Sequence, residues 1–378
     1  MRGTLWASTV DAAAQAALDP GIPAALDRHP DVLVVGGGVI GLATAAFCRR
    51  AGVGRVLLIE AARLAAAASG GAGGALAPEL HQLSDPPAFV ALARASLALY
   101  RQLDQDWDRA LGLEWTPGLL LLPGGPLAGL QPWSGVELLD PERVAELVPE
   151  LVPMPGGLLA HAQARVHPLR LAAELARRAG SVATGVAMTD VQVAGGRIVQ
   201  VRTTVGDLHP GVVVFATGLA PEPWVRVPQR LVKGHLVATE PVGFRLACGV
   251  HSPGLGVGSM ADGGLLAGGT RDEGDHSVQV RPAVVQGIMR RLSELLPAAG
   301  QVHVRYRWCC FRPATVDGQP VIDRVPGLDN AWVSAGHDGT GLLMAPATGQ
   351  ALAAWVTTSR QPQEVSSFGL SRFDQPQP

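Results

Sequence analysis

The chain has 378 residues, 47% of them apolar, and a net charge of −2, so it is long enough for about two domains with their own cores. A nearly neutral chain without a block of lysine and arginine is not expected to bind nucleic acid, and without a run of about 18 apolar residues it is not expected to span a membrane. The N-terminal segment contains Asp11 and no cleavage site, and the four cysteines form no CxxC pair, which favours a reduced, cytoplasmic protein.

The chain opens with a segment of weak periodicity and continues into a strongly patterned one. Residues 1–30 contain three prolines, and we expect them to form a surface arm. The next segment has apolar runs at 32–35 and 55–60 on either side of a helical stretch of small residues at 40–50. Strand, glycine turn, helix and strand in this order predict a βαβ unit.

Strand patterns dominate the middle of the chain. In order, we expect a loop of small residues at 62–78, a helix at 87–111, short strands within 113–165, a helix at 168–179, strands and hairpins at 182–218, further strands within 227–310 with one helix at 281–296, and from Trp332 a strand, a glycine loop and a helix. This pattern predicts an α/β chain, α+β overall, with an antiparallel β-rich domain inserted into a Rossmann-type domain.

A dinucleotide-binding pattern lies in the first βαβ unit. Gly36, Gly38 and Gly41 form GxGxxG, where the glycines permit a tight turn, close approach of a pyrophosphate and close packing of the helix on the sheet. Free N–H groups at the start of the helix attract phosphate. Glu60 ends the second strand, where it can accept hydrogen bonds from a ribose and disfavours NADP. The motif leaves FAD and NAD open.

Three later segments resemble a known family. VVVFATG ends at Thr217-Gly218, FRPATVDGQPVI covers 311–322, and SAGHDGTGLLMAPATG covers 334–349. Together with the N-terminal unit they resemble the D-amino-acid oxidase superfamily of FAD-dependent flavoproteins, and within it the glycine oxidases. The resemblance extends from about residue 31 to about residue 355 and is thin between about 93 and 160.

The resemblance implies a discontinuous FAD-binding domain and non-covalent FAD. The implied FAD-binding domain comprises 31–92, 156–226 and 318–360, the substrate domain comprises 93–155 and 227–317, and 361–378 form a tail. The cofactor-binding residues that it implies are Gly36, Gly38, Val39, Ile40, Gly41, Glu60, Ser69, Gly70, Val186, Thr217, Gly218, His337, Gly339, Thr340, Gly341 and Leu342. The ten histidines show no metal-ligand spacing, so we expect no metal.

Arg312 is the main candidate for substrate binding and catalysis. It matches the arginine that holds the substrate carboxylate in glycine oxidases, and a guanidinium fork pairs bidentately with a carboxylate. The alternative role is a surface or interdomain ion pair. The chain departs from glycine oxidases at Gly256 and Met260, which replace a tyrosine and an arginine. We therefore expect both residues to line a roomier, less polar substrate pocket that suits a bulkier or N-substituted substrate.

Two other residues have competing roles. Cys310 matches the position at which the sarcosine-oxidase branch bonds its flavin covalently, but a small buried side chain on a strand is the favoured interpretation. His337 is retained as a catalytic candidate, although a structural role in the loop beside the flavin suits it better.

The implied activity is FAD-dependent oxidation of the C–N bond of a small amino acid or secondary amine. Hydride would pass from Cα to flavin N5 without a general base, and the imine would then hydrolyse. Electrons are expected to reach O2, whereas a quinone or another acceptor would make the enzyme a dehydrogenase. An NAD-dependent dehydrogenase and a non-catalytic dinucleotide-binding module are the remaining alternatives. Expected partners are therefore the small substrate and the electron acceptor, and a homo-oligomer is left open.

Overall fold

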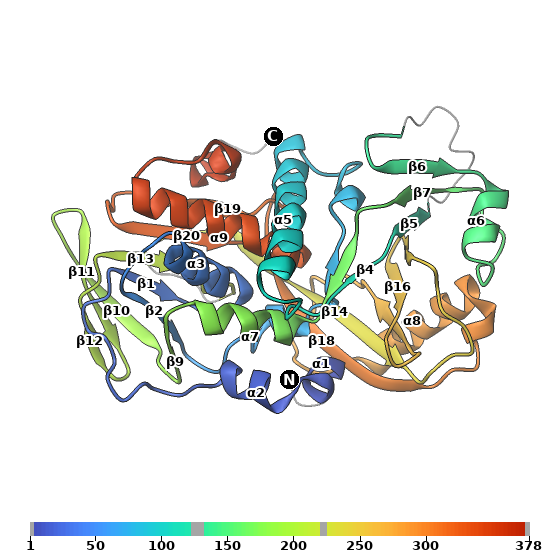
Figure 1. Cartoon of the computed structure of the whole chain (residues 1–378), viewed down its shortest axis with the longest axis horizontal. Coiled ribbons are helices and arrows are strands. Elements are labelled where there is room, and N and C mark those ends of the chain that lie inside the picture. Colours follow the sequence, from blue (N-terminus) through green and yellow to red (C-terminus); the bar gives the residue numbers. More distant parts are fainter. Residues whose placement is uncertain (1–3, 122–131, 220–224, 375–378) are drawn as a thin grey trace.

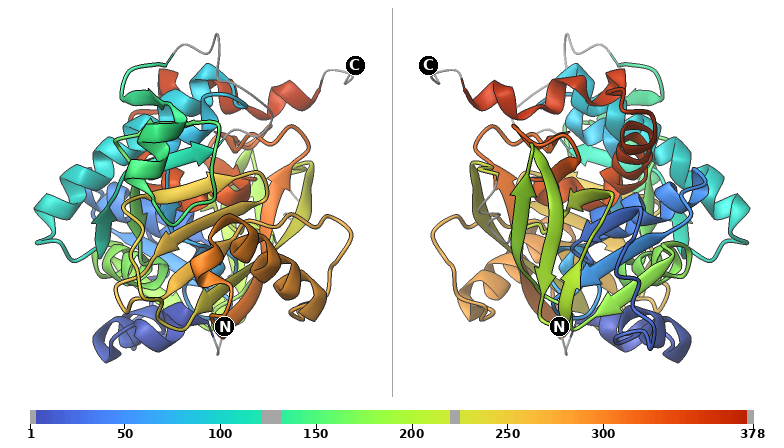
Figure 2. Two further views of the ribbon diagram at one scale, coloured as in Figure 1. Left: turned by 90° about the vertical axis from the view of Figure 1, so that its right-hand side faces the viewer. Right: turned by 90° about the vertical axis from the view of Figure 1, so that its left-hand side faces the viewer.

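The computed structural model describes residues 4–121, 132–219 and 225–374. Figure 1 shows two β-sheet lobes side by side, with α3 (Val39–Arg50) and α9 (Gly341–Thr358) on one lobe and α8 (Pro282–Leu295) on the other. The side views show that the N-terminal segment lies at the opposite edge of the molecule from the C-terminal segment (Figure 2).

The first lobe is built on a six-stranded sheet in the order β19-β20-β13-β1-β2-β9. Its strands are β1 (Val32–Val35), β2 (Val56–Glu60), β9 (Ser181–Thr184), β13 (Val212–Phe215), β19 (Val321–Arg324) and β20 (Ala331–Ala335). The central strand β1 pairs in parallel with β2 and β13. Alternate residues of β1 face opposite ways, so Val34 packs beneath α3 and α9, and Leu33 packs toward a small sheet formed by residues 188–208. Both faces are buried, which explains the continuous apolar run.

The second lobe is built on an eight-stranded sheet in the order β18-β14-β17-β16-β15-β5-β7-β6. Its strands are β5 (Gly118–Leu121), β6 (Val136–Leu139), β7 (Gly157–Ala160), β14 (Gln229–Thr239), β15 (Gly249–Ser252), β16 (Leu255–Ser259), β17 (Leu265–Gly268) and β18 (Val304–Thr315). The pairing is antiparallel except between β15 and β5. Helices α6 (Pro141–Leu147) and α8 cover one face through Val144, Val285 and Leu292. The inserted antiparallel domain predicted from the sequence is confirmed.

Smaller elements complete the described chain. They are β3 (Ala75–Leu76), β4 (Leu113–Trp115) and β8 (Ala164–Val166) in one sheet; β10 (Met188–Ala194), β11 (Arg197–Thr203) and β12 (Gly206–Leu208) in another; the helices α1 (Leu5–Thr9), α2 (Ala12–Leu18), α4 (Ala68–Gly71), α5 (Pro87–Asp106) and α7 (Pro168–Arg178); and the short 3-10 helices η1 (Pro78–His81), η2 (Pro297–Ala299), η3 (Asp338–Thr340), η4 (Gln363–Phe368) and η5 (Leu370–Phe373). Of the predicted helices, the one expected at 87–111 ends five residues early, at Asp106. The helix α6 was missed because it has only seven residues.

The N-terminal segment is not the surface arm expected from its sequence. Its described part forms α1 and α2, which pack on α7 and bury Trp6 and Leu18. The Trp6 indole N–H donates to the Ala72 carbonyl oxygen at 2.8 Å. Helices of five and seven residues are too short to show a convincing period, so the sequence pattern concealed them.

Two expected domain boundaries also differ from the structure. The boundary at 92/93 divides α5, which packs against α9 along the first lobe through Phe89, Ala93 and Tyr100. The boundary at 155/156 assigns β7 to the first lobe, although β7 pairs with β5 and β6 in the second. Both errors arise where the chain crosses between lobes within a patterned segment. Of the expected tail, η4 packs on α5 and α9, and residues 375–378 lie outside the described residues.

None of the helices in the described ranges is both long and apolar enough to cross a membrane.

The closest approach of α3 and α9 depends on Gly349. A Cβ at this position would stand 2.7 Å from the backbone carbon of Ala43. We predict that Gly349→Val separates the two helices and lowers the free energy of unfolding by about 1–3 kcal/mol, as overpacked cores do. The midpoint of urea unfolding checks this, with Gln350→Ala on the exposed face of α9 as the control. Equal midpoints for the two variants would show that the helices can move apart without lowering the free energy of unfolding.

Candidate active site

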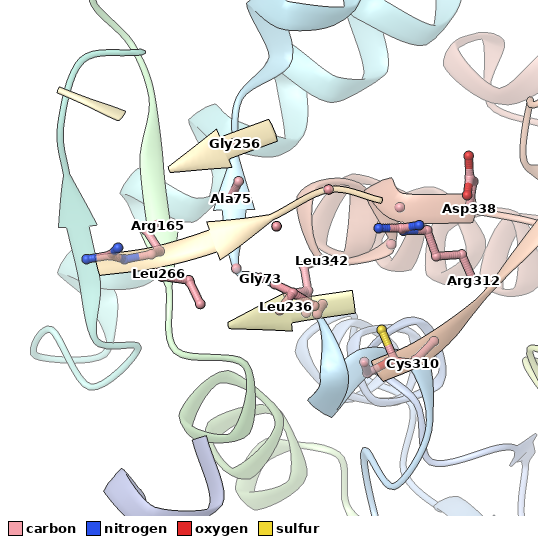
Figure 3. Close-up of a pocket in the computed structure, with 18 of the residues that line it drawn as sticks. Gly73, Ala75, Arg165, Leu236, Gly256, Leu266, Cys310, Arg312, Asp338 and Leu342 are labelled. Atoms are coloured by element: carbon pink, nitrogen blue, oxygen red, sulfur yellow. The ribbon is translucent and has the colours of Figure 1, made fainter. Parts of the chain in front are cut away.

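A cavity of about 390 Å³ lies where the two lobes meet. The first lobe contributes the turn at Gly38, the loop around Ser69 and Gly73, and the start of α9 at Leu342. The second lobe contributes β14, β16, β17 and β18 through residues such as Leu236 and Arg312. Figure 3 shows Arg312 and Asp338 on one side of this cavity and Arg165 and Gly256 on the other.

Glycine is needed for different reasons at the three positions of the first turn. Gly36 has φ +113°, and a Cβ there would stand 2.7 Å from the carbonyl carbon of Ala216. A Cβ at Gly41 would collide with the Gly36 carbonyl group. At Gly38, by contrast, a Cβ would meet only the Ser69 hydroxyl, at 3.4 Å. Gly36 and Gly41 are therefore required by the fold, whereas Gly38 keeps the cavity side of the turn open.

Polar groups surround this turn. The Val39 N–H at the start of α3 donates to the Ser69 hydroxyl at 3.0 Å. The Glu60 carboxylate accepts from the N–H groups of Gly37 at 2.6 Å and Ala62 at 2.9 Å. The Val186 N–H donates to the Glu60 carbonyl at 2.9 Å. An anion-binding helix N-terminus and an acid at the end of β2 thus stand together, as a dinucleotide requires.

The glycine loop after β20 forms a second wall. His337 is buried, and this burial lowers its pKa to about 3, so its ring is neutral at pH 7. The His337 carbonyl oxygen accepts from the N–H of Thr340 at 2.9 Å and from its hydroxyl at 2.7 Å. The ring itself contacts the Thr348 hydroxyl, with 3.4 Å between Nε2 and Oγ1. These contacts favour the structural role of His337, which stays a prediction.

Arg312 projects from β18 into the cavity with few partners. Its Nη1 donates to the Thr270 carbonyl at 2.9 Å, and no carboxylate among the described residues lies within ion-pair distance. Burial lowers the pKa of its guanidinium. The side chain lies over two glycines: a Cβ at Gly234 would stand 2.6 Å from Cζ, and one at Gly339 would stand 3.4 Å from Nε. The alternative role, an interdomain ion pair, is therefore not observed among the described residues.

A strap comprising residues 270–281 holds the Thr270 carbonyl that Arg312 contacts. Lys233, the only lysine in the sequence, is fully buried beneath this strap. Its Nζ donates to Asp275 at 2.8 Å, to the Ser277 hydroxyl at 3.1 Å and to the Gln279 carbonyl at 2.7 Å. Arg271 of the strap also pairs with Asp338 at 2.7 Å. The strap therefore connects the second lobe to the glycine loop.

Most of the candidates from the sequence converge on the cavity. Those that line it are Gly38, Val39, Ile40, Ser69, Gly218, Gly256, Arg312, His337, Gly339, Gly341 and Leu342. Those that adjoin it as parts of the same turns, strands and loops are Gly36, Gly41, Glu60, Gly70, Val186, Thr217 and Thr340. Their role in cofactor binding stays a prediction.

Met260 does not fit its expected place. It packs in the core of the first lobe and lines a smaller cavity of about 190 Å³ beside Trp6 and His167. Met260 is the first residue after β16, which ends at Ser259, and the sequence could not show that the chain turns away from the cavity there.

Cys310 lines the cavity, and Cys309 does not. The Cys310 thiol donates to the Gly71 carbonyl at 3.3 Å, and burial raises its pKa, so it is protonated at neutral pH. The Cys309 thiol points to the other side of β18, toward the Val278 carbonyl at 3.5 Å.

Several polar residues that line the cavity were not predicted from the sequence. They are Thr116, Gln163, Arg165, Arg245, His251 and Ser259. Gln163 and Arg165 lie in the Pro- and Gly-broken segment 113–165, and His251 is on a four-residue strand. No motif marks them, because they come together only through sheet pairing.

Comparison with known proteins identifies the family. The model of a family described as FAD dependent oxidoreductase matches residues 31–355. The chain belongs to this family. The flavoprotein is 28% identical over 338 residues to a glycine oxidase of Pseudomonas putida, covering 84% of this chain and 92% of that one. It is 26% identical over 360 residues to the bifunctional protein ThiO/ThiG of Synechocystis, and spans only about half of that relative (91% of this chain, 54% of that one).

Solved structures share the fold. The glycine oxidase of Geobacillus kaustophilus has a TM-score of 0.80 at 24% identity, covering 91% of this flavoprotein and 99% of that chain. The L-proline dehydrogenase of P. horikoshii has a TM-score of 0.81 at 20% identity, covering 92% and 99%.

FAD is the cofactor of this family, and the cavity suits it. The open space over Gly38, the amides at the start of α3 and the carboxylate of Glu60 fit its pyrophosphate and ribose, and the cavity continues from there to the glycine loop. The sequence prediction of an FAD-binding Rossmann unit is thereby confirmed at the level of the family.

We predict that the purified flavoprotein is yellow and releases FAD on denaturation. Gly38→Val should abolish FAD binding, because its side chain fills the space that the pyrophosphate needs. Flavin absorbance after reconstitution with excess FAD measures this, with Gly243→Val as the control at an exposed position with no neighbour within 4 Å. Release of FMN, or a fully loaded Gly38 variant, would contradict the assignment of this turn.

We predict that the FAD is held without a covalent bond, because the Cys310 thiol is protonated and engaged by the Gly71 carbonyl. Acid precipitation should therefore leave all flavin in the supernatant. A yellow pellet that becomes colourless in Cys310→Ala, but stays yellow in Cys309→Ala, would show that Cys310 is attached to the flavin.

Proposed function

We propose that this flavoprotein oxidises the C–N bond of a small amino acid or N-substituted amino acid. The observation that carries the proposal is the half-buried Arg312 guanidinium, which faces the cavity without a carboxylate partner among the described residues. An unpaired cation in such a place is costly unless a ligand completes it, and a carboxylate matches its fork. The names of the related glycine oxidases agree with this substrate class.

Bound FAD supplies the chemistry by accepting hydride from the substrate Cα. The residues of this chain act by positioning. Arg312 fixes the carboxylate, and with it the direction of the Cα–H bond. Apolar side chains such as Leu236, Leu266 and Leu342 exclude water from the cavity. The amides of the glycine loop offer hydrogen bonds to negative charge that develops beside them. No side chain is needed to remove a proton from Cα, which agrees with the lowered pKa of His337, about 3, because a ring with so low a pKa is a weak base.

The electron acceptor is proposed to be O2, as in the oxidases named above. The shared fold of an L-proline dehydrogenase supports a second candidate, in which another acceptor reoxidises the flavin. Turnover with O2 alone, compared with turnover in the presence of an artificial quinone, separates the two.

We predict that Arg312→Ala lowers the rate constant for flavin reduction per unit substrate by roughly 10- to 1,000-fold. Arg312→Lys should recover only part, because an ammonium group cannot form the fork. The loss should be large for an amino acid and small for its decarboxylated analogue. Anaerobic stopped-flow measurement of flavin bleaching with this matched pair gives the result. Equal losses for both compounds would assign Arg312 a structural role.

Gly234 gives an independent test of the same geometry. Gly234→Ala should displace the guanidinium and lower the reduction rate for amino acids by about 10-fold or more, whereas Gly243→Ala should leave it unchanged. Because the Gly234 variant retains the arginine, an unchanged rate would show that the position of this guanidinium over the glycine does not matter.

A further inference from the structure

Gln163 and His251 form a polar pair in the wall of the cavity, on the second lobe. The Gln163 side chain is 5% exposed, and its Nε2 lies 3.2 Å from the His251 Nε2. Both residues line the cavity, and neither is used in the proposal for Arg312. Figure 3 places their neighbours Gly256 and Arg165 across the cavity from Arg312.

Three glycines on adjacent strands make room for this pair. A Cβ at Gly118 of β5 would stand 2.6 Å from the Gln163 Cδ, and one at Gly249 of β15 would stand 2.9 Å from its Nε2. Gly249 is the sheet partner of Gly118, and His251 is the sheet partner of Gly256 on β16. The amide and the ring therefore occupy space that side chains at these three glycine positions would fill.

The hydrogen-bond pattern leaves one ring nitrogen for a ligand. An amide nitrogen can only donate, so the His251 Nε2 accepts and the proton is on Nδ1. Burial lowers the pKa of His251 to about 4, so the ring is neutral at pH 7. A Cβ at Gly256 would stand 3.5 Å from Nδ1, and Gly256 itself lines the cavity. The Nδ1–H group thus lies beside Gly256, at a place where the wall of the cavity carries no side chain.

Gln163 is incompletely paired. Its Oε1 is buried without a hydrogen-bond partner among the described residues, which is rare for a polar atom in a protein interior. Its other end, Nε2, contacts the His251 ring and so holds the tautomer and direction of that ring.

We infer that His251, oriented by Gln163, is a specificity-determining residue that donates a hydrogen bond to an oxygen on the substituent of the substrate. This inference rests on the proposed amino-acid oxidation and deepens it. The substrate class is an amino acid that places its carboxylate at Arg312 and carries a hydroxyl, ether or amide oxygen on its nitrogen or Cα. Gly256, the position that replaces a tyrosine in glycine oxidases, provides the space for this substituent.

The test uses pairs of compounds that differ in the oxygen alone. N-(2-hydroxyethyl)glycine is compared with N-propylglycine, and both enantiomers of threonine are compared with those of valine. Anaerobic flavin bleaching gives the rate constant per unit substrate, and calorimetric titration gives the binding constant. For at least one pair, we expect the wild-type protein to prefer the compound with the oxygen by roughly 5- to 50-fold.

Variants of the pair assign the preference to its atoms. His251→Phe keeps a ring and should reduce the preference to about 1, whereas His251→Asn should restore part of it because an amide N–H can replace Nδ1–H. Gln163→Leu should give a partial loss, since the ring is then free to turn. His303→Phe, at an exposed position outside the cavity, should leave the preference unchanged.

The outcomes separate this inference from the proposed function. If the compounds bleach the flavin but no pair shows a preference, or if His251→Phe retains it, the inference is overturned and the proposed function stands. If no compound bleaches the flavin, the proposed function fails. The binding constants from calorimetric titration then decide alone whether His251 donates a hydrogen bond to the oxygen of the bound compound.

Discussion

A half-buried cation without a protein counter-charge is the constraint on which the cavity depends. Arg312 makes one hydrogen bond to a carbonyl group and otherwise faces the cavity. Removing a charge from water costs several kcal/mol unless it is paired, so the surrounding structure has to hold it there. Glycines at 234 and 339 make the space, and the strap at 270–281 supplies the carbonyl group. The guanidinium therefore remains available to pair with the carboxylate of a ligand, as proposed above.

Glycines also make space in other parts of the cavity wall. On the first lobe, glycines bring the backbone of the β1–α3 turn close enough for a pyrophosphate. On the second lobe, glycines on β5, β15 and β16 leave room for an amide and an imidazole. A high glycine content is typical of disordered chains, yet many of the 47 glycines here line one cavity between two well-packed cores.

The elements that could be predicted from the sequence are those whose structure is determined by residues close together in the chain. Strands 32–35 and 56–60 and the helix between them follow from apolar runs and a turn that needs glycine, and the end of the chain follows from a similar pattern. Gln163 and His251 are 88 residues apart and meet because Gln163 lies against Gly118 of β5, which pairs with β15. Met260 was misplaced for a related reason, since the direction of a side chain at a strand end depends on packing. The arm escaped detection because α1 and α2 gain their stability from burying Trp6 and Leu18, not from their own length.

The buried Lys233 has a practical consequence for handling this protein. Because it is the only lysine in the sequence and has no exposed surface, the folded molecule offers no lysine side chain to amine-directed labels, cross-linkers or surface immobilisation. The ammonium group is sealed by three hydrogen bonds to the strap, so it becomes reactive only when the strap lifts. Acylation of Lys233, followed by mass spectrometry, therefore reports local opening of the strap beside Arg312 without any engineered probe.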